Sequence, residues 1–312
     1  MDPLGLDGGV VPELSPLPGG HSGETFLAES AGERSVVRIY AAASAWRGPN
    51  AAEVDAAVLR LVRGLVPVPE VLEVRRADDA AGTPALLVTS WMPGRRLDEV
   101  LPEADDDLAA TIGRNLGKVL ARLAQMPMLR AGMFLDGELR IGPMPPAVAD
   151  LVTWVEERSA SGPLSEWSPD DLGALRGVAD RAQDLVDLTD RACLVHSDVN
   201  PKNVLVDPVS GEVMALLDWE FAHSGSPFAD LGNLLRFDRR PGFAEAVLAT
   251  YFERVVDAPA DLLDRARAAD LFALVELASR RGQNPVADRA HDRLLAIARS
   301  GDPHADGPGS PG

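Results

Sequence analysis

The chain has 312 residues, of which 46% are hydrophobic and 25% are charged, proportions typical of a globular protein with a sizeable core. No run of residues approaches the roughly 20 consecutive apolar positions that a membrane helix needs. The N-terminus lacks the basic patch and apolar stretch of a secretory signal. We therefore expect neither a membrane protein nor an exported protein, and a cytoplasmic location.

The net charge limits the class of partner. Forty-eight acidic and 30 basic residues give a formal net charge of -18, which repels nucleic acid and anionic lipid at long range. The same charge attracts cationic small molecules. Cys193 is the single cysteine, so an intramolecular disulfide and a cysteine-based metal site are excluded. The sequence indicates no obligate protein partner.

The first part of the chain is rich in predicted strands. Residues 1–18 predict a loop with one short strand near Val10. Apolar residues at helical spacing predict a helix from Asn50 to Arg63, which Gly64 and the prolines after it end. Runs of β-branched and apolar residues predict further strands at 25–29, 35–40, 71–74 and 85–90. A small sheet with one main helix follows from these elements.

Beyond Pro93 the pattern becomes helical, with one hairpin of short apolar strands. The hairpin consists of residues 203–206 and 213–217, and residues 207–211 between them have a turn composition. Periodicity predicts helices at about 105–125, 147–159, 169–188, 229–237, 242–256 and 260–298.

The two patterns indicate an α+β protein with two lobes. The N-terminal lobe covers residues 1–92 and ends in a hinge, and the helical C-terminal lobe covers residues 93–300. Residues 301–312 are rich in glycine and proline and predict a disordered tail. We expect the functional site in the cleft between the lobes.

The residues that carry chemistry surround the predicted hairpin. Asp198 lies in the loop before the first strand, where a carboxylate can accept the proton of a substrate hydroxyl and aim its oxygen at a phosphate. Asn203 begins that strand and Asp218 follows its partner strand. The hairpin brings these two residues together, and their oxygens are of the kind that Mg²⁺ prefers. The pattern is typical of phosphoryl transfer.

The constellation of His196-Ser197-Asp198, Asn203, Asp218-Trp219 and Asp230-Leu231-Gly232 resembles the aminoglycoside phosphotransferase family. Members of this family are relatives of protein kinases that phosphorylate hydroxyls of small molecules, and the resemblance spans about residues 18–235. It implies a bilobal, protein-kinase-like fold, Mg²⁺ as cofactor, and ATP or GTP as phosphoryl donor. The chain departs from the family pattern at Ser197, where glycine is usual, and at Gly232, where alanine is usual.

The resemblance also implies a phosphate-binding part in the N-terminal lobe. Gly20, His21 and Ser22 match the family's nucleotide loop, in which backbone N–H groups approach phosphate. Arg38 stands where a strand lysine usually binds the α- and β-phosphates, and no lysine precedes Lys118. Asp55 is the expected acidic partner of Arg38.

Two further groups of residues have roles that the resemblance implies. Ser90 and Met92 match the hinge, whose backbone groups bind adenine. His196 and Asp230 match residues that orient the catalytic loop, and we expect a structural role for them. Glu53 remains an alternative partner for Arg38.

We therefore expect an O-phosphotransferase that inactivates a cationic antibiotic, either an aminoglycoside or a basic peptide of the viomycin–capreomycin (tuberactinomycin) type. Acidic side chains of the C-terminal part are candidate contacts for ammonium or guanidinium groups. These candidates include Glu220, Asp238, Asp270 and Glu276. The motifs leave three alternatives: a macrolide kinase, a metabolic kinase acting on choline, homoserine or a sugar, and a catalytically silent nucleotide-binding regulator.

Overall fold

The computed structural model describes residues 13–17, 24–30, 32–40, 47–78, 80–145, 150–237 and 240–307. The strand expected near Val10, the loop residues Gly20, His21 and Ser22, and Asp238 lie outside these ranges.

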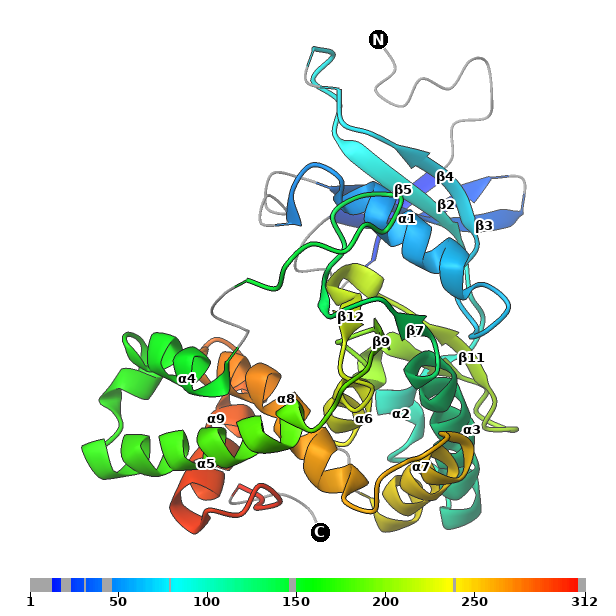
Figure 1. Ribbon diagram of the computed structural model, residues 1–312. Helices are drawn as coiled ribbons and strands as arrows, with labels where there is room; N and C mark the ends of the chain where they lie inside the picture. Colours follow the sequence, from blue (N-terminus) through cyan, green and yellow to red (C-terminus); the bar gives the residue numbers. More distant parts are fainter. Residues whose placement is uncertain are drawn as a thin grey trace.

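The first described residues form an antiparallel sheet with one helix packed against it. Within the described ranges this sheet has five strands in the order β1-β2-β3-β5-β4. They are β1 Glu13–Pro16, β2 Glu24–Ser30, β3 Glu33–Tyr40, β4 Val71–Arg75 and β5 Ala85–Ser90. Helix α1 (Ala51–Val62) packs against β4 and β5 (Figure 1). The expected strand-rich N-terminal part with one main helix is confirmed.

The remainder of the chain is mainly helical. Its helices are α2 Leu97–Val100, α3 Asp106–Ala124, α4 Leu151–Ser159, α5 Pro169–Asp187, α6 Ala229–Leu234, α7 Pro241–Arg254, α8 Leu262–Ala278 and α9 Pro285–Ser300. The prediction of one helix over residues 260–298 is wrong, because the segment after Ala278 turns at Gly282, which has φ +86°. Asn284 then caps α9 by accepting the backbone N–H of Ala287.

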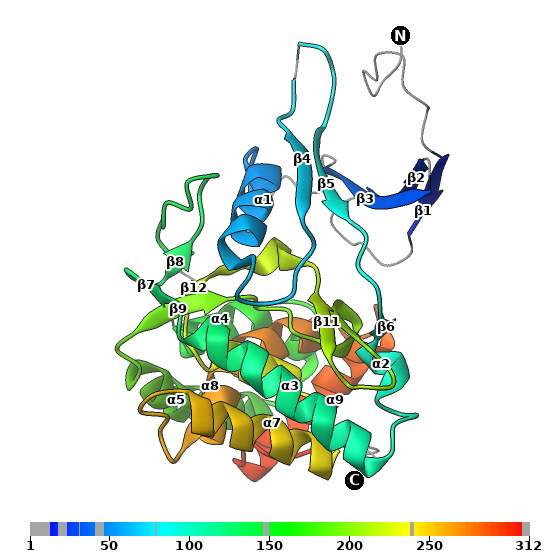
Figure 2. The same ribbon diagram turned by 90° about the vertical axis from the view of Figure 1, so that its right-hand side faces the viewer.

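Two small sheets of short strands lie between the strand-rich part and the long helices (Figure 2). The predicted hairpin is β10 (Val204–Val206) with β11 (Val213–Leu216), and β6 (Arg95–Arg96) pairs with β10 on its other side. The second sheet contains β7 Pro127–Met128, β8 Gly132–Met133, β9 Ala192–Val195 and β12 His223–Gly225. These strands escaped prediction because they have two to four residues and pair with distant segments.

Helices α3 and α7 lie side by side and pack against each other (Figure 2). Two glycines of α3 permit this contact. A Cβ atom on Gly113 would lie 2.5 Å from the carbonyl oxygen of Phe243, and one on Gly117 would lie 2.8 Å from the Cβ of Thr250. These glycines therefore serve helix packing.

Two clusters of buried residues form the core. The larger cluster joins α1 to α3, α6, α7 and the β10–β11 hairpin, so the strand-rich part and the helical part share apolar contacts. The second cluster lies among α4, α5, α8 and α9, and Ala305 packs against it. His304 also contacts Asp264 at 2.7 Å. Residues 301–307, assigned to the tail from the sequence, thus contact α8 and α9. No helix in the described part of the chain is long and apolar enough to cross a membrane.

Candidate active site

The loop that follows β9 is held in an unusual backbone conformation. Ser197 has φ +69°, in the left-handed region that favours glycine. Its backbone N–H donates to Oδ1 of Asp230 at 2.7 Å, and the N–H of His196 donates to Oδ2 of the same carboxylate at 2.9 Å. These two bonds hold the strained residue in place. Its positive φ explains why glycine is usual at this position in the family pattern.

Asp230 ties this loop to α6. Its side chain is 5% exposed, and burial raises its pKa because desolvation of the carboxylate outweighs the opposing effects of His196 and of the two backbone N–H bonds. The neighbouring Gly232 brings α6 close to α8. A Cβ atom at this position would lie 2.1 Å from the carbonyl oxygen of Ala266, so the alanine of the family pattern does not fit this helix pair.

His196 links the loop to the end of β11. The ring Nε2 donates to the carbonyl oxygen of Leu217 at 2.9 Å, and the ring Nδ1 accepts the backbone N–H of Asp198 at 3.2 Å. A carbonyl oxygen only accepts and a backbone N–H only donates, so the proton lies on Nε2. His196 is fully buried beside the ring of Trp219. The imidazole therefore sets the position of Asp198 through the backbone.

The Asp198 carboxylate is oriented by two amides. Oδ1 accepts from Nδ2 of Asn200 at 2.8 Å, and Oδ2 accepts from Nδ2 of Asn203 at 2.8 Å. The Nδ2 group of Asn203 also donates to the backbone carbonyl of Asp198 at 3.0 Å. Because its Nδ2 group is engaged with Asp198, Asn203 has its amide oxygen as the group that can bind a metal ion.

The hairpin brings Asp218 to the same place. The backbone N–H of Leu217 donates to the carbonyl oxygen of Asn203 at 2.8 Å, so Asp218 follows directly after a residue bonded to Asn203. Asp218 itself has φ 62° and ψ 66°, a left-handed conformation that ends β11 and turns the chain into the short helix Trp219–Phe221. The structure thus places Asp198, Asn203 and Asp218 at the open end of one hairpin, opposite its turn.

Arg38 joins the strand-rich part to this hairpin. Its Nη1 donates to Asp218 Oδ1 at 2.7 Å and its Nη2 donates to Glu220 Oε2 at 2.6 Å. Burial acts to lower the pKa of Arg38, but Asp218, Tyr40 and Glu220 together outweigh burial and raise it. The guanidinium therefore stays charged between two carboxylates.

The acidic residue of α1 has a different partner from the one expected. Asp55 is 4% exposed and forms an ion pair with Arg47, whose Nη1 donates to Oδ2 at 2.8 Å. The hydroxyl of Tyr40 donates to the same Oδ2 at 2.6 Å. The alternative partner, Glu53, accepts from Arg76 at the surface. The expectation that Asp55 or Glu53 neutralises Arg38 is corrected by these contacts.

Sequence reasoning missed Arg47 and Tyr40. A signal for Tyr40 was present, because residues 38 and 40 point to the same face of one strand, and the Arg38 guanidinium lies 5.5 Å from the Tyr40 ring centroid. Arg47 carries no comparable signal, since it precedes α1 by several residues and only the fold turns it towards Asp55.

The hinge residues are partly engaged with the sheet. The backbone N–H of Ser90 donates to the carbonyl oxygen of Glu70 at 2.9 Å, and Ser90 Oγ accepts the N–H of Glu70 at 2.9 Å. Ser90 Oγ also lies 3.8 Å from Met92 Sδ. The N–H of Ser90 therefore serves the sheet in this structure, and Met92 is the better candidate for contact with a nucleotide base.

Three of the expected acceptor contacts have arginine partners, since Glu220 pairs with Arg38 and two acids of α8 are paired as well. Asp270 forms a buried ion pair with Arg236, whose Nε and Nη2 donate to its two oxygens at 2.9 and 2.5 Å. Glu276 forms ion pairs with Arg158 and Arg280. These two acids stabilise contacts within the helical part, because each has arginine partners of its own and so lacks an unbalanced charge for a ligand.

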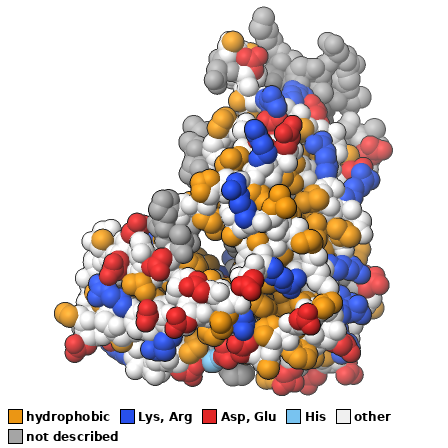
Figure 3. Space-filling model, viewed as in Figure 1, with side chains coloured by type: hydrophobic (Ala, Val, Ile, Leu, Met, Phe, Trp, Pro, Cys, Tyr) orange, Lys and Arg blue, Asp and Glu red, His pale blue; other side chains and the backbone are white. Residues whose placement is uncertain are grey.

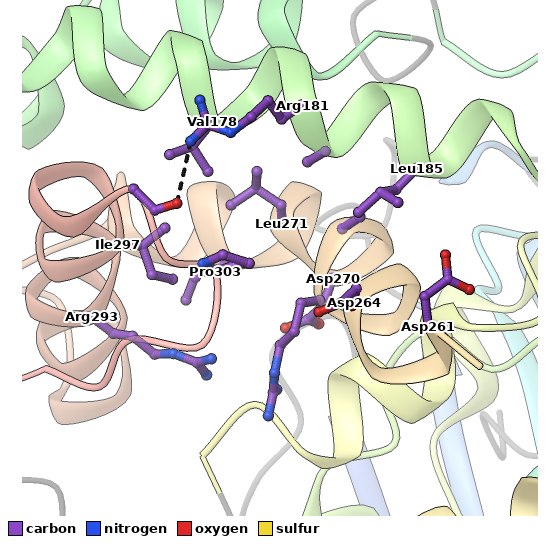
Figure 4. A pocket seen from close by; sticks show the side chains of 15 residues that line it. Val178, Arg181, Leu185, Asp261, Asp264, Asp270, Leu271, Arg293, Ile297 and Pro303 are labelled. Carbon is purple, nitrogen blue, oxygen red and sulfur yellow. Dashed lines mark hydrogen bonds between the residues drawn. The ribbon is translucent and has the colours of Figure 1, made fainter. Parts of the chain in front are cut away.

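A cavity of about 250 Å³ lies among α5, α8, α9 and the segment at Gly301 and Pro303. Figure 4 shows Leu185, Leu271 and Ile297 turned towards it, with a hydrogen bond from Arg181 to the Gly301 carbonyl oxygen at 3.3 Å on one side. Its acids have partners within the protein, since Asp261 pairs with Arg265 and Asp264 contacts His304. This cavity belongs to the second core cluster rather than to the Asp198 site.

The comparisons with known proteins bear on this geometry. A family model described as Phosphotransferase enzyme family matches residues 13–271. The aminoglycoside 3'-phosphotransferase of Streptomyces ribosidificus is 30% identical over 202 residues, which are 62% of this chain and 69% of that enzyme. Acyl-CoA dehydrogenase family member 10 of Mus musculus is 26% identical over 221 residues, which are 70% of this chain and 20% of that protein. The chain therefore spans a fifth of the length of this longer relative.

Solved structures share the fold at low identity. A thermostable mutant of aminoglycoside phosphotransferase APH(4)-Ia, in a ternary complex with ADP and hygromycin B, has a TM-score of 0.66 at 20% identity and covers 93% of this chain and 94% of its own. The GDP complex of aminoglycoside 2'-phosphotransferase-IIIa has a TM-score of 0.67 at 16% identity and covers 94% of both chains. The predicted kinase-like α+β fold is confirmed.

Proposed function

Because the chain belongs to the phosphotransferase enzyme family, we propose that it transfers the γ-phosphate of ATP or GTP to a hydroxyl group of a cationic small-molecule antibiotic. The convergence of Asp198, Asn203 and Asp218 at one hairpin carries this proposal. In phosphoryl transfer the protein mainly positions the reactants and neutralises charge, and these three side chains suit both tasks.

In this proposal Asp198 is the catalytic residue. Its carboxylate is held by Asn200 and Asn203 in a fixed direction, so it can accept the hydrogen bond of the acceptor hydroxyl and take its proton as the oxygen attacks phosphorus. His196 and Asp230 fix the loop behind it and remain outside the reaction.

The donor set fits a magnesium ion. In the described part of the chain no cluster of three or more His, Cys, Asp or Glu residues is arranged for a metal, and the candidates at the hairpin are carboxylate and amide oxygens. Mg²⁺ is usually held by one or two carboxylates together with phosphate oxygens and water. Asp218 and Asn203 would hold the ion, which would neutralise the charge of the phosphates.

The net charge of the protein and the names of its relatives support a cationic acceptor. The net charge of -18 favours a cation, and two relatives are named for aminoglycosides or bind hygromycin B. Figure 3 shows acidic side chains over α4 and α5, at the rim of a hollow beside the strand-rich part. Exposed acids of these helices include Glu157, Asp170, Asp180 and Asp184. We infer that the acceptor approaches from this side.

The proposal also assigns the lobes and the location. Residues 1–92 would bind the nucleotide and residues 93–300 would supply the catalytic loop, the metal ligands and the acceptor site. Met92 would contact the base and Arg38 the phosphates, and the reaction would take place in the cytoplasm, where the nucleotide is abundant.

A nucleoside diphosphate release assay tests the proposal. Aminoglycosides, tuberactinomycin peptides, macrolides, choline, homoserine and a panel of sugars are each offered with ATP and with GTP. We expect release with a cationic antibiotic, and we expect Asp198→Asn to lower kcat by at least about a thousandfold, since it removes both the base and the charge that orients the hydroxyl. Full activity of this variant with the acceptor would show that the assigned base is wrong, and turnover of choline or homoserine alone would favour a metabolic kinase.

A further inference from the structure

Asp55, the buried acid of α1, is neutralised by a residue other than Arg38. Asp55 is enclosed by Arg47 and the hydroxyl of Tyr40, and the side chains of Arg47 and Asp55 are 7% and 5% exposed. This ion pair joins α1 to the segment that precedes it, both within the strand-rich part. Arg38 lies near the end of β3, two residues before Tyr40, and interacts with the hairpin of the helical part.

Arg38 bridges two carboxylates with one planar group. Its two terminal nitrogens reach Asp218 at 2.7 Å and Glu220 at 2.6 Å. The Glu220 side chain is 5% exposed and the Arg38 side chain is 16% exposed, so water can replace little of this interaction. Two carboxylates so close together repel each other unless a cation lies between them.

A metal ion bound by Asp218 would lie next to the guanidinium of Arg38, which donates to Oδ1 of that carboxylate. Mg²⁺ binds oxygen ligands at about 2.1 Å, and a guanidinium that donates to the same carboxylate oxygen stands in the way of such a contact. The single positive charge of the arginine and the double positive charge of the metal ion also repel each other when both lie against one carboxylate. Arg38 and a metal ion therefore compete for Asp218.

We propose that Arg38 fills the metal site of the nucleotide-free protein, with Glu220 as its second carboxylate, and leaves it only when nucleotide phosphates arrive to take the guanidinium. This inference rests on the proposed function for the nucleotide, and it is argued from the contacts of Arg38 with Asp218 and Glu220. A planar guanidinium binds phosphate through two parallel N–H bonds, so the phosphates offer Arg38 an equivalent partner. Asp218 and Glu220 are then both released for the cation.

The consequence is an unusual effect of charge removal. In most nucleotide sites the loss of a basic residue weakens binding of every component, because the phosphates lose a partner. Here the loss of Arg38 also removes a competitor of the metal. Metal binding to the nucleotide-free protein should therefore become tighter, while nucleotide binding becomes weaker.

Titration of the full-length, nucleotide-free protein with Mn²⁺ alone, followed by the electron paramagnetic resonance of free Mn²⁺, tests this inference. We expect Arg38→Gln to bind Mn²⁺ at least about tenfold more tightly than the wild-type protein, since removal of a directly competing positive charge favours the ion. Arg63→Gln is the matched control, because Arg63 pairs with Glu70 at the surface and both side chains are exposed. It should leave Mn²⁺ affinity at the wild-type value.

Further variants separate the possible outcomes. Asp218→Asn and Glu220→Gln, each added to Arg38→Gln, should abolish the gain in affinity. An Arg38→Gln protein that binds Mn²⁺ no better than wild type overturns the inference. A gain in Mn²⁺ affinity that persists in each of the two double variants also overturns it. If Asp218→Asn abolishes Mn²⁺ binding in the presence of ADP while Arg38→Gln brings no gain, the proposed function stands and only the competition is refuted.

A second measurement covers the case in which Arg38→Gln is poorly folded. Arg38→Lys retains a charge but reaches one carboxylate instead of two, so its Mn²⁺ affinity should lie between those of the wild-type protein and Arg38→Gln. The melting temperature of both variants should rise more on addition of Mn²⁺ than that of the wild type, because the ion then replaces the charge that the guanidinium of Arg38 supplied to the two carboxylates. Equal shifts in all three proteins would contradict the inference.

Discussion

Asn203 donates its side-chain N–H to Oδ2 of Asp198 at 2.8 Å, so a candidate metal ligand also orients the candidate base. Asn200 donates to the other oxygen of the same carboxylate at 2.8 Å. Its own Oδ1, however, accepts the backbone N–H of Lys202. The two asparagines thus share one partner and differ in what else they can do. This difference allows the two roles to be separated by mutation.

The first prediction concerns these asparagines. Asn203→Ala should lower kcat by about a hundredfold or more and raise the Mg²⁺ concentration needed for half-maximal activity, because it removes both the orienting bond and a metal ligand. Asn200→Ala should lower kcat by about tenfold with the Mg²⁺ requirement unchanged. Steady-state kinetics at several Mg²⁺ concentrations measure both quantities. An equal change in the Mg²⁺ requirement of the two variants would contradict the assignment of Asn203 as a ligand.

The second prediction concerns the glycine at position 232. Gly232→Ala should lower the free energy of unfolding by about 1–3 kcal/mol, since the added methyl group meets the carbonyl oxygen of Ala266 at 2.1 Å and forces α6 away from α8. Gly173→Ala is the control, because this glycine is exposed on α5 and a Cβ atom there meets nothing within 4 Å. That variant should gain about 0.5–1 kcal/mol from helix propensity. Urea unfolding followed by circular dichroism distinguishes the two signs.

The third prediction separates structural acids from acceptor contacts. Asp270→Asn should destabilise the protein by about 3–5 kcal/mol, because it leaves the buried Arg236 charge without its counter-ion. Glu276→Gln should cost less than about 1 kcal/mol, since its ion pairs lie nearer the surface. For a cationic acceptor, KM should remain at the wild-type value in both variants at a temperature where they are folded. A severalfold rise in KM for either one would restore it as an acceptor contact.

The fourth prediction concerns pH and His291. The ring of His291 is 2% exposed, and its Nε2 accepts the indole N–H of Trp167 at 2.8 Å. Burial, and then the nearby Arg281, lower the pKa of this imidazole, while Asp292 opposes them in part. Protonation in the folded state would need the lone pair that Trp167 uses, so the unfolded chain binds the proton more readily.

His291 stabilises the folded protein while its imidazole is neutral. The stability that neutral His291 provides is present above the ordinary histidine pKa and is lost as pH falls through and below it, by at most about 1.4 kcal/mol for each pH unit. His291→Gln keeps an acceptor for Trp167 and does not titrate. Thermal unfolding between pH 7.5 and 5 should therefore show a steeper fall for the wild type than for this variant. Parallel curves would refute the contribution of His291.

Local spacing explains why part of the site could be predicted. His196, Asp198 and Asn203 lie within one loop, and the turn at residues 207–211 returns Asp218 beside them. Covalent connection limits how far such residues can separate, so their order in the sequence already implies their proximity. The same reasoning explains why the strand-rich part, its helix and the long helices were predicted, while the two-residue strands β6, β7 and β8 were not.

The amino-acid sequence by itself determined the family, the kinase-like class of fold and the residues of the catalytic loop. Only the tertiary structure decided the ionic partners, giving Asp55 to Arg47, Asp270 to Arg236, and both Asp218 and Glu220 to Arg38. The partners of Arg38 lie 180 and 182 residues away from it. A charged side chain interacts with whichever opposite charge the packing of helices and strands brings within about 3 Å, and no local pattern along the chain specifies that choice.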